Sequence, residues 1–191
     1  MNNTFPFTAI VGLELAKRSL LLHAIDPTLG GLLLMGQRGC AKSTLARSFR
    51  EILPPISKVQ EAPFVEVPLG TTEDRLLGSI DASRLLADGE WSAQTGLIQK
   101  ANDGVLYIDE VNLLPDYLVD SILDSAASGQ QRIERDGLSK NVSARYILIG
   151  SMNPEEGDLR PQLTDRFMHG VLRSEERRVG KECRSRWSPY H

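Results

Sequence analysis

The chain has 191 residues, of which 41% are hydrophobic and 25% are charged, and its 22 basic and 25 acidic side chains give a formal net charge of −3. Residues 1–172 contain 16 of the basic and 22 of the acidic side chains, so this part of the chain is acidic. That balance excludes the basic footprint of a nucleic-acid-binding protein, and no apolar run approaches the length of a membrane span. One cysteine before residue 173 excludes a disulfide framework and indicates a reducing compartment, which we expect to be the cytoplasm.

Apolar strands alternate with helical patterns along residues 1–172, as is typical of a mostly parallel α/β sheet covered by helices. Helices are expected at 13–24, 42–52, 72–77, 96–101, 118–128 and 161–167. Strands are expected at 31–35, 64–67, 104–108 and 146–150. An inserted hairpin or loop is expected at 82–92, and a second hairpin at 132–135 and 142–145 around Asp136-Gly137.

The last segment, residues 173–191, differs abruptly from the rest and shows no hydrophobic periodicity. It resembles the in-frame translation of a sequencing-library adapter, and such additions are excluded from fold reasoning. We therefore expect one domain in residues 1–172, incomplete at its C-terminus, followed by a non-native tail. The alternative is a genuine basic tail that binds nucleic acid or a membrane.

A glycine-rich loop, residues 36–44, follows the first apolar strand. Backbone N–H groups in such a loop point inward at a polyphosphate, and the helix that begins after it adds its positive end. Lys42 is placed to neutralise the β- and γ-phosphates of a nucleotide, and Ser43 offers its hydroxyl to Mg²⁺. The predicted nucleotide-binding residues are Gly36, Gln37, Arg38, Gly39, Cys40, Ala41, Lys42, Ser43 and Thr44.

Ala41 stands where the usual loop has glycine immediately before the lysine. A methyl group is the smallest possible intrusion on the phosphates, and we expect it to fit with a negative φ at this residue. Cys40 is interpreted as a small loop filler, with a redox switch as the alternative. The alternative for the whole motif is a glycine-rich turn that happens to precede Lys-Ser.

Two acids close the strand at 104–108. Asp109 is expected beside Mg²⁺ at the C-terminal edge of the sheet, where doubly wound folds bind ligands. Glu110 is then free to orient or deprotonate the attacking water. Asn153, after the strand at 146–150, can reach the γ-phosphate, although an asparagine that caps a turn before proline is the alternative.

Arg166 is the remaining candidate for chemistry. It follows a helical turn, with Phe167 as an apolar anchor, and an exposed arginine there can reach a phosphate in a neighbouring subunit. The alternative is an intrachain salt bridge with Asp165 or Glu155.

Taken together, the phosphate loop and the motifs at 108–110, 152–157 and 159–167 resemble the AAA+ module of the magnesium chelatase ATPase subunit and related cobaltochelatase-like ATPases. The resemblance covers residues 5–167. It implies a P-loop NTPase fold, an AAA+ three-layer α/β/α domain with a mostly parallel sheet and β-hairpin inserts, and a C-terminal helical lid that this chain lacks. Thr164 and the run 167–169 depart from the family pattern.

The resemblance also implies roles for single residues. In that family the acidic pair is the Walker B motif, the asparagine is sensor 1, and the arginine is a finger that acts on the next subunit. These roles are carried onto Asp109, Glu110, Asn153 and Arg166, and the adenine pocket onto Ile10 and Val11.

The function that the resemblance implies is a motor subunit that hydrolyses ATP with Mg²⁺. It would work in a homo-oligomeric ring, expected to be a hexamer, with other chelatase subunits and without nucleic acid or membrane. A larger partner would insert Mg²⁺ or Co²⁺ into a tetrapyrrole, protoporphyrin IX in the case of Mg²⁺. The alternatives are a MoxR-type chaperone ATPase and a non-hydrolysing scaffold, and intact Lys42, Asp109 and Glu110 argue against the scaffold.

Overall fold

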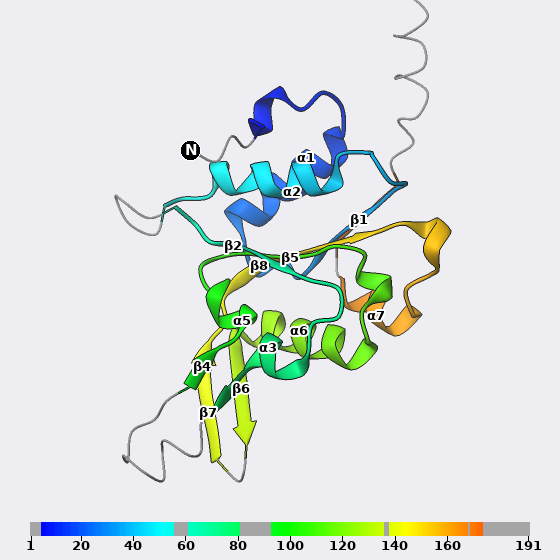
Figure 1. Ribbon diagram of the computed structural model, residues 1–191. Helices are drawn as coiled ribbons and strands as arrows, with labels where there is room; N and C mark the ends of the chain where they lie inside the picture. The colour runs from blue at the N-terminus through cyan, green and yellow to red at the C-terminus, as the bar shows by residue number, and fades with distance from the viewer. Residues whose placement is uncertain (1–4, 56–60, 81–92, 136–137, 168, 174–191) are drawn as a thin grey trace, which may run out of the picture.

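A parallel sheet runs through the middle of the molecule (Figure 1). The computed structural model describes residues 5–55, 61–80, 93–135, 138–167 and 169–173. The sheet has the order β2-β5-β8-β1-β9, and each neighbouring pair is parallel. Its strands are β1 (Leu32–Met35), β2 (Phe64–Val67), β5 (Gly104–Ile108), β8 (Tyr146–Met152) and β9 (His169–Arg173). The predicted parallel α/β sheet is therefore confirmed.

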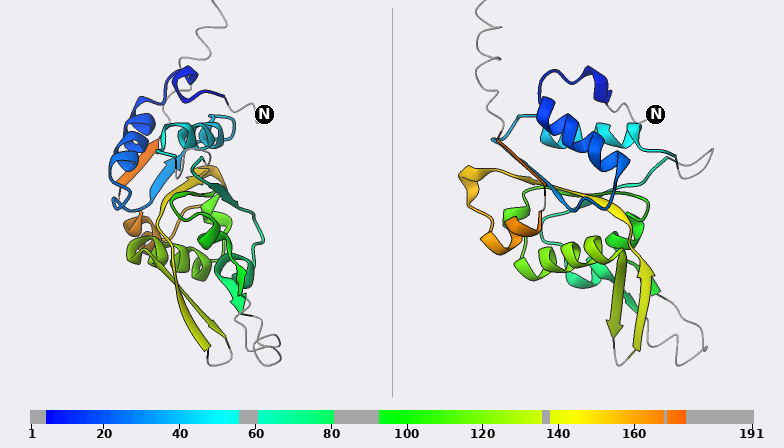
Figure 2. Two further views of the ribbon diagram at one scale, coloured as in Figure 1. Left: turned by 90° about the vertical axis from the view of Figure 1, so that its left-hand side faces the viewer. Right: turned by 180° about the vertical axis from the view of Figure 1, so that it is seen from behind.

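Helices cover both faces of this sheet (Figures 1 and 2). One face carries η1 (Phe7–Ala9), α1 (Glu14–Ile25) and α2 (Lys42–Phe49), and the other carries α3 (Glu73–Leu77), α5 (Leu97–Lys100), α6 (Asp116–Ser128) and α7 (Pro161–Arg166). Single helical turns follow α2, β5 and β8, namely η2 (Arg50–Ile52), η3 (Val111–Leu113) and η4 (Pro154–Glu156). This is the expected three-layer α/β/α arrangement.

Two apolar cores, one on each face, hold the layers together. Leu32 and Leu34 of β1 pack with Phe49 of α2, whereas Leu33 packs with Leu118 of α6 on the opposite side. Successive side chains of a strand point to opposite faces, so a continuous apolar run such as β1 supplies both cores. Burial on both faces fixes the register of the sheet and thereby the position of the loops at its C-terminal edge.

Two antiparallel hairpins extend from the face that carries α6. β3 (Gly78–Ile80) pairs with β4 (Ala93–Thr95), and β6 (Gln130–Arg135) pairs with β7 (Leu138–Ser143). The second hairpin confirms the expected pair of strands, although its return strand begins and ends earlier in the chain than predicted. The expected insertion at 82–92 and the Asp136-Gly137 turn lie outside the described residues.

β9 is an element that the sequence did not predict. Its pattern contains only Val171 and Leu172 as aliphatic residues, which is too little for a strand to be recognised. It pairs with β1 and so covers an edge that would otherwise expose unpaired backbone groups. The strand ends at Arg173, which is the first residue of the expected tail. The helix expected at 42–52 is also shorter, because its last turn tightens into the 3₁₀ turn η2.

Candidate functional site

The loops after β1, β5 and β8 meet at the C-terminal edge of the sheet and enclose a cavity of about 380 Å³. Its lining consists of Arg38, Gly39, Cys40, Ala41, Lys42, Ser43, Thr44, Asp109, Glu110 and Asn153. Three motifs that are far apart in the sequence are thus brought together, as the parallel strands predict. Gly36 and Gln37 belong to the same loop but are not among the lining residues.

Lys42 occupies the centre of the phosphate loop. Its Nζ donates hydrogen bonds to the carbonyl oxygens of Gly36, at 2.6 Å, and Gln37, at 3.0 Å. The N–H of Gly36 donates to the carbonyl oxygen of Met152 in β8 at 3.0 Å, which fixes the start of the loop to the sheet. α2 begins at Lys42, so the positive end of a helix faces the same cavity. The loop therefore combines the positive charge of Lys42, the N–H groups at the N-terminus of α2 and a starting point that is anchored to the sheet.

Ala41 corrects one expectation. Its φ is +60° and its ψ is 21°, in the left-handed region, whereas we expected a negative φ. The physical reason is that Ala41 is the N-cap of α2, where the chain must reverse sharply to start the helix at Lys42. For a residue with a Cβ, this conformation costs roughly 1–2 kcal/mol. The glycine of the usual pattern would avoid that cost.

Ala41→Gly should therefore make the protein more stable, by roughly 0.5–1 kcal/mol in the free energy of unfolding, since the relief of strain exceeds the added freedom of the unfolded chain. Chemical denaturation measures it. The matched control is Ala127→Gly at an exposed position of α6, which should lose about 1 kcal/mol. A loss of similar size at both positions would contradict the strain at Ala41.

Asp109 is held by two donors that sequence reasoning missed. Ser151 Oγ donates to Asp109 Oδ1 at 2.6 Å, and the Tyr107 hydroxyl donates to the same oxygen at 2.9 Å. Ser151 is fully buried in β8, and burial raises the pKa of Tyr107, so the phenol stays protonated as a donor. The sequence feature that could have indicated this contact is Ser151, a small polar residue inside the apolar run of β8. One carboxylate oxygen of Asp109 is thereby fixed, which orients the group towards the cavity.

Glu110 is fixed mainly through its backbone. Its φ of +53° lies in the left-handed region, and its N–H donates to Ser151 Oγ at 3.2 Å. Strained residues of this kind cluster at functional sites, where the surrounding structure holds them. Glu110 Oε1 accepts a hydrogen bond from Arg38 Nη2 at 3.2 Å. Ser151 therefore joins the two acids, since it donates to Asp109 and accepts from Glu110.

The capping interpretation of Asn153 is confirmed, whereas its reach to a γ-phosphate stays a prediction. Asn153 caps η4, where its Oδ1 accepts a hydrogen bond from the N–H of Glu155 at 3.3 Å, and it also lines the cavity. Its side chain is buried, 4% exposed. A buried amide at this edge of the sheet has a fixed direction.

The donor set fits a nucleotide with Mg²⁺. Ser43 supplies a hydroxyl and Asp109 a carboxylate within one cavity, next to the ammonium group of Lys42. Mg²⁺ at nucleotide sites takes one or two protein carboxylates or hydroxyls and completes its shell with phosphates and water. Among the described residues there is no cluster of three or more His, Cys, Asp or Glu side chains that would hold a metal by itself. A site that binds metal together with phosphates is therefore the arrangement that fits.

Arg166 does not line this cavity. It ends α7 and pairs with two acids of α6, with Nη1 2.8 Å from Asp120 Oδ1 and Nη2 bonded to Asp124 Oδ1. The sequence alternative, a pair with Asp165 or Glu155, named the wrong partners. The guanidinium side chain is 39% exposed, so it remains accessible from outside the molecule.

The segment expected at the adenine pocket lies beside α2 but does not line the cavity either. Ile10 is buried and its carbonyl oxygen accepts a hydrogen bond from Lys17 Nζ, whereas Val11 is 94% exposed. Phe7 of η1 packs against Phe49 with ring centroids 6.4 Å apart. The adenine-binding role of this segment remains a prediction.

Cys40 is a partly buried loop residue, as expected for a filler. Its Sγ donates to the carbonyl oxygen of Gln37 at 2.8 Å.

In the described part of the chain, no helix combines the length and the apolar character needed to cross a membrane.

Comparisons with known proteins identify the family of this chain. Residues 31–167 match the family model for the AAA domain of the dynein-related subfamily. Magnesium-chelatase subunit ChlI of Olisthodiscus luteus is 49% identical in an alignment of 190 positions that covers 89% of this chain and 57% of that protein. The uncharacterized protein Rv2850c of Mycobacterium tuberculosis is 52% identical over 163 residues, 85% of this chain and 26% of that protein.

A solved structure also shows similarity to magnesium chelatase. In a cryo-EM-based structure of the complex between subunits BchI and BchD of magnesium chelatase, one chain is 42% identical with a TM-score of 0.77, and the match covers 98% of this chain and 67% of that one. The chain spans 57% and 60% of the lengths of two ChlI relatives that it matches. The chain belongs to the dynein-related subfamily of AAA domains and is a homologue of magnesium-chelatase subunit ChlI.

Proposed function

We propose that the chain is the ATP-hydrolysing module of a chelatase motor subunit. The observation that carries the proposal is the convergence of Lys42, Ser43, Asp109, Glu110 and Asn153 on one cavity. The similarity to ChlI and BchI supports a role in a chelatase over the alternative of a MoxR-type chaperone ATPase. A non-hydrolysing scaffold would need neither the paired acids nor their shared support by Ser151.

Binding is the task of the phosphate loop and Asp109. Lys42 and the N-terminus of α2 neutralise the β- and γ-phosphates, while Ser43 and Asp109 hold Mg²⁺. When bound, ATP with Mg²⁺ supplies the phosphoryl group to be transferred and a divalent charge beside it. Ser151 and Tyr107 keep the Asp109 carboxylate in place for that ion.

Hydrolysis is assigned to residues around the expected position of the γ-phosphate. Glu110 accepts the proton of the attacking water, and Asn153 orients that water or the γ-phosphate. Arg166 lies away from the cavity of its own chain, and we propose that it contributes positive charge to the site of the next subunit. Its exposure is compatible with that role.

The whole protein is proposed to form a homo-oligomeric ring, a hexamer, that works with the other chelatase subunits in the cytoplasm. The likeness to a chain of the BchI–BchD complex supports such partners. We propose that the complex inserts Mg²⁺ into protoporphyrin IX, because several relatives are named for that metal. Co²⁺ is the alternative, and the assembled complex offered each metal in turn distinguishes the two.

Glu110→Gln should separate binding from hydrolysis. The substitution keeps the size of the side chain and removes the base, so the full-length protein should bind ATP with Mg²⁺ while its turnover falls by roughly 10²-fold or more. Calorimetry measures the binding, and phosphate release measures the turnover. The loss of turnover should also stop metal insertion by the assembled chelatase.

The matched control is Glu73→Gln, the same chemical change at an exposed position in the first turn of α3. Its turnover should equal that of the parent. Parental turnover in the Glu110→Gln protein would show that Glu110 is a structural acid, and a parent that binds but never hydrolyses ATP would favour the scaffold.

A further inference from the structure

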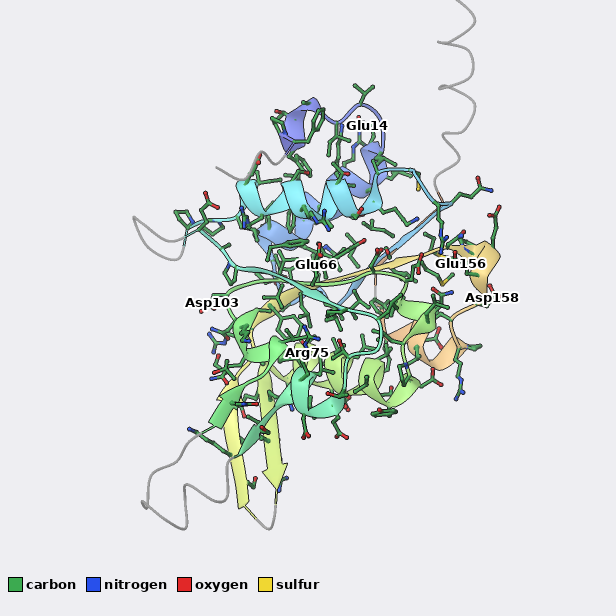
Figure 3. All side chains as sticks on the ribbon, in the orientation of Figure 1. Glu14, Glu66, Arg75, Asp103, Glu156 and Asp158 are labelled. Carbon is green, nitrogen blue, oxygen red and sulfur yellow. The ribbon has the colours of Figure 1, made fainter. Side chains whose placement is uncertain are left out.

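Arg38 joins the phosphate loop to two carboxylates from different loops. Its Nη2 lies 3.2 Å from Oε1 of Glu110 and 2.7 Å from Oε1 of Glu156. Glu110 follows β5, and Glu156 belongs to η4 after β8, where Figure 3 labels it at the edge of the sheet. One guanidinium nitrogen therefore serves both acids.

The contact is part of a wider attachment between the phosphate loop and η4. Gln37, next to Arg38, donates a hydrogen bond from its Nε2 to Glu155 Oε1. η4 is in turn capped by Asn153. The loop that holds the phosphates, the proposed base and the proposed sensor are thus linked through two neighbouring side chains.

Glu156 depends on Arg38. Its side chain is 22% exposed, and its Oε2 is buried with no hydrogen-bond partner among the described residues. Because the Glu110 and Glu156 carboxylates share one nitrogen, they lie close together and would repel each other without the guanidinium between them. A carboxylate with freely rotating χ angles would then leave the position beside the cavity.

The position of Arg38 allows it to orient the Glu110 side chain but gives it little influence on folding stability. Its side chain is 73% exposed, and exposed ion pairs contribute little to folding. It lines the cavity together with Glu110, so its effect falls on the geometry of the site. The backbone of Glu110 is already fixed by Ser151, which leaves the side chain as the part that Arg38 orients.

We infer that Arg38 is a positioning residue for Glu110, with Glu156 as the anchor that holds Arg38 in place. The inference rests on the proposed ATPase function and adds to it a group that acts through the base. It assigns to the side chain of Arg38 a role other than phosphate binding. Nucleotide affinity should therefore depend little on Arg38, whereas turnover should depend on it strongly.

The test is Arg38→Ala in the full-length protein. We expect kcat to fall by about 10- to 10²-fold, because a misplacement of about 1 Å can cost up to about 10²-fold, with KM for ATP and the calorimetric affinity essentially unchanged. Glu156→Gln should lower kcat in the same direction by a smaller factor. In Glu110→Gln protein, Arg38→Ala should cause no further loss, since the residue that it positions has already lost its function.

A structural readout does not depend on activity. Crystals of the nucleotide-free Arg38→Ala protein should show the Glu110 side chain in a different rotamer from the parent. The matched control is Arg47→Ala, which removes an exposed guanidinium of α2 that pairs with Glu66 at 2.6 Å outside the cavity. It should leave kcat and the Glu110 rotamer unchanged.

Several outcomes overturn the inference. A raised KM with unchanged kcat would assign Arg38 to phosphate binding, and an unmoved Glu110 in the variant crystal would exclude positioning. Losses that multiply in the Arg38→Ala, Glu110→Gln double variant would make the two residues independent. A parent that does not hydrolyse ATP would remove the proposed function as well, whereas an active parent with a fully active Arg38→Ala variant removes this inference alone.

Discussion

Lys42→Ala should weaken ATP binding by at least about 10²-fold, because hydrogen bonds to a charged group contribute roughly 1.5–3 kcal/mol each. The ammonium group already lies inside the loop, held by the carbonyl oxygens of Gly36 and Gln37. Little reorganisation is therefore needed when it turns to the β- and γ-phosphates. Arg38, the other basic residue of the loop, is engaged by Glu110 and Glu156.

Calorimetry with ATP and Mg²⁺ is the direct measurement. Lys100→Ala, the loss of an exposed lysine at the end of α5, makes the same change in net charge and should leave the affinity unchanged. Thermal unfolding of both variants shows whether the loop variant still folds. Parental affinity in folded Lys42→Ala protein would rule out the phosphate-loop assignment.

The cavity could be predicted from the sequence because a parallel sheet orders the ends of its strands. Lys42 follows β1, Asp109 and Glu110 follow β5, and Asn153 follows β8, and these three strands are neighbours. Strand and loop patterns were sufficient for this step, since the C-terminal ends of parallel strands meet at one edge.

The support around the acids could not be predicted in the same way. The bonds from Ser151 to Asp109 and from Arg38 to Glu156 join residues that are far apart in the chain. Their formation depends on rotamers that the packed cores select, and local patterns carry no information about those. β9 was missed for a related reason, because its pairing with β1 and not its own composition makes it a strand.

The backbone of Ala41 and the partners of Arg166 show two further limits of prediction from the sequence. The φ of Ala41 was judged from the clash that a methyl group causes, but the turn into α2 decides it. Arg166 pairs with Asp120 and Asp124, which are four residues apart on α6 and therefore lie on one face of that helix. That proximity of α6 and α7 follows from the fold and not from the chain order.

Arg166→Ala should leave ATP binding intact and abolish hydrolysis in the proposed ring of the full-length protein. A finger contributes charge only to the transition state in the neighbouring site, an effect of about 10³-fold or more in comparable phosphoryl-transfer systems. The variant should remain folded, since its ion pairs with Asp120 and Asp124 are partly exposed and contribute little. Release of the guanidinium from these acids would be the local change when it enters the neighbour's site.

Mixing two inactive variants tests the action between subunits. Arg166→Ala subunits keep an intact nucleotide site and Lys42→Ala subunits keep an intact finger, so one type of mixed interface should regain activity. The ATPase rate is measured against the mixing ratio, with co-assembly confirmed separately. Arg160→Ala is the matched control, because Arg160 precedes the same helix and pairs with Asp116 at 2.6 Å. No recovery at any ratio would favour an intrachain role for Arg166, and recovery of Arg160→Ala instead would transfer the finger to Arg160.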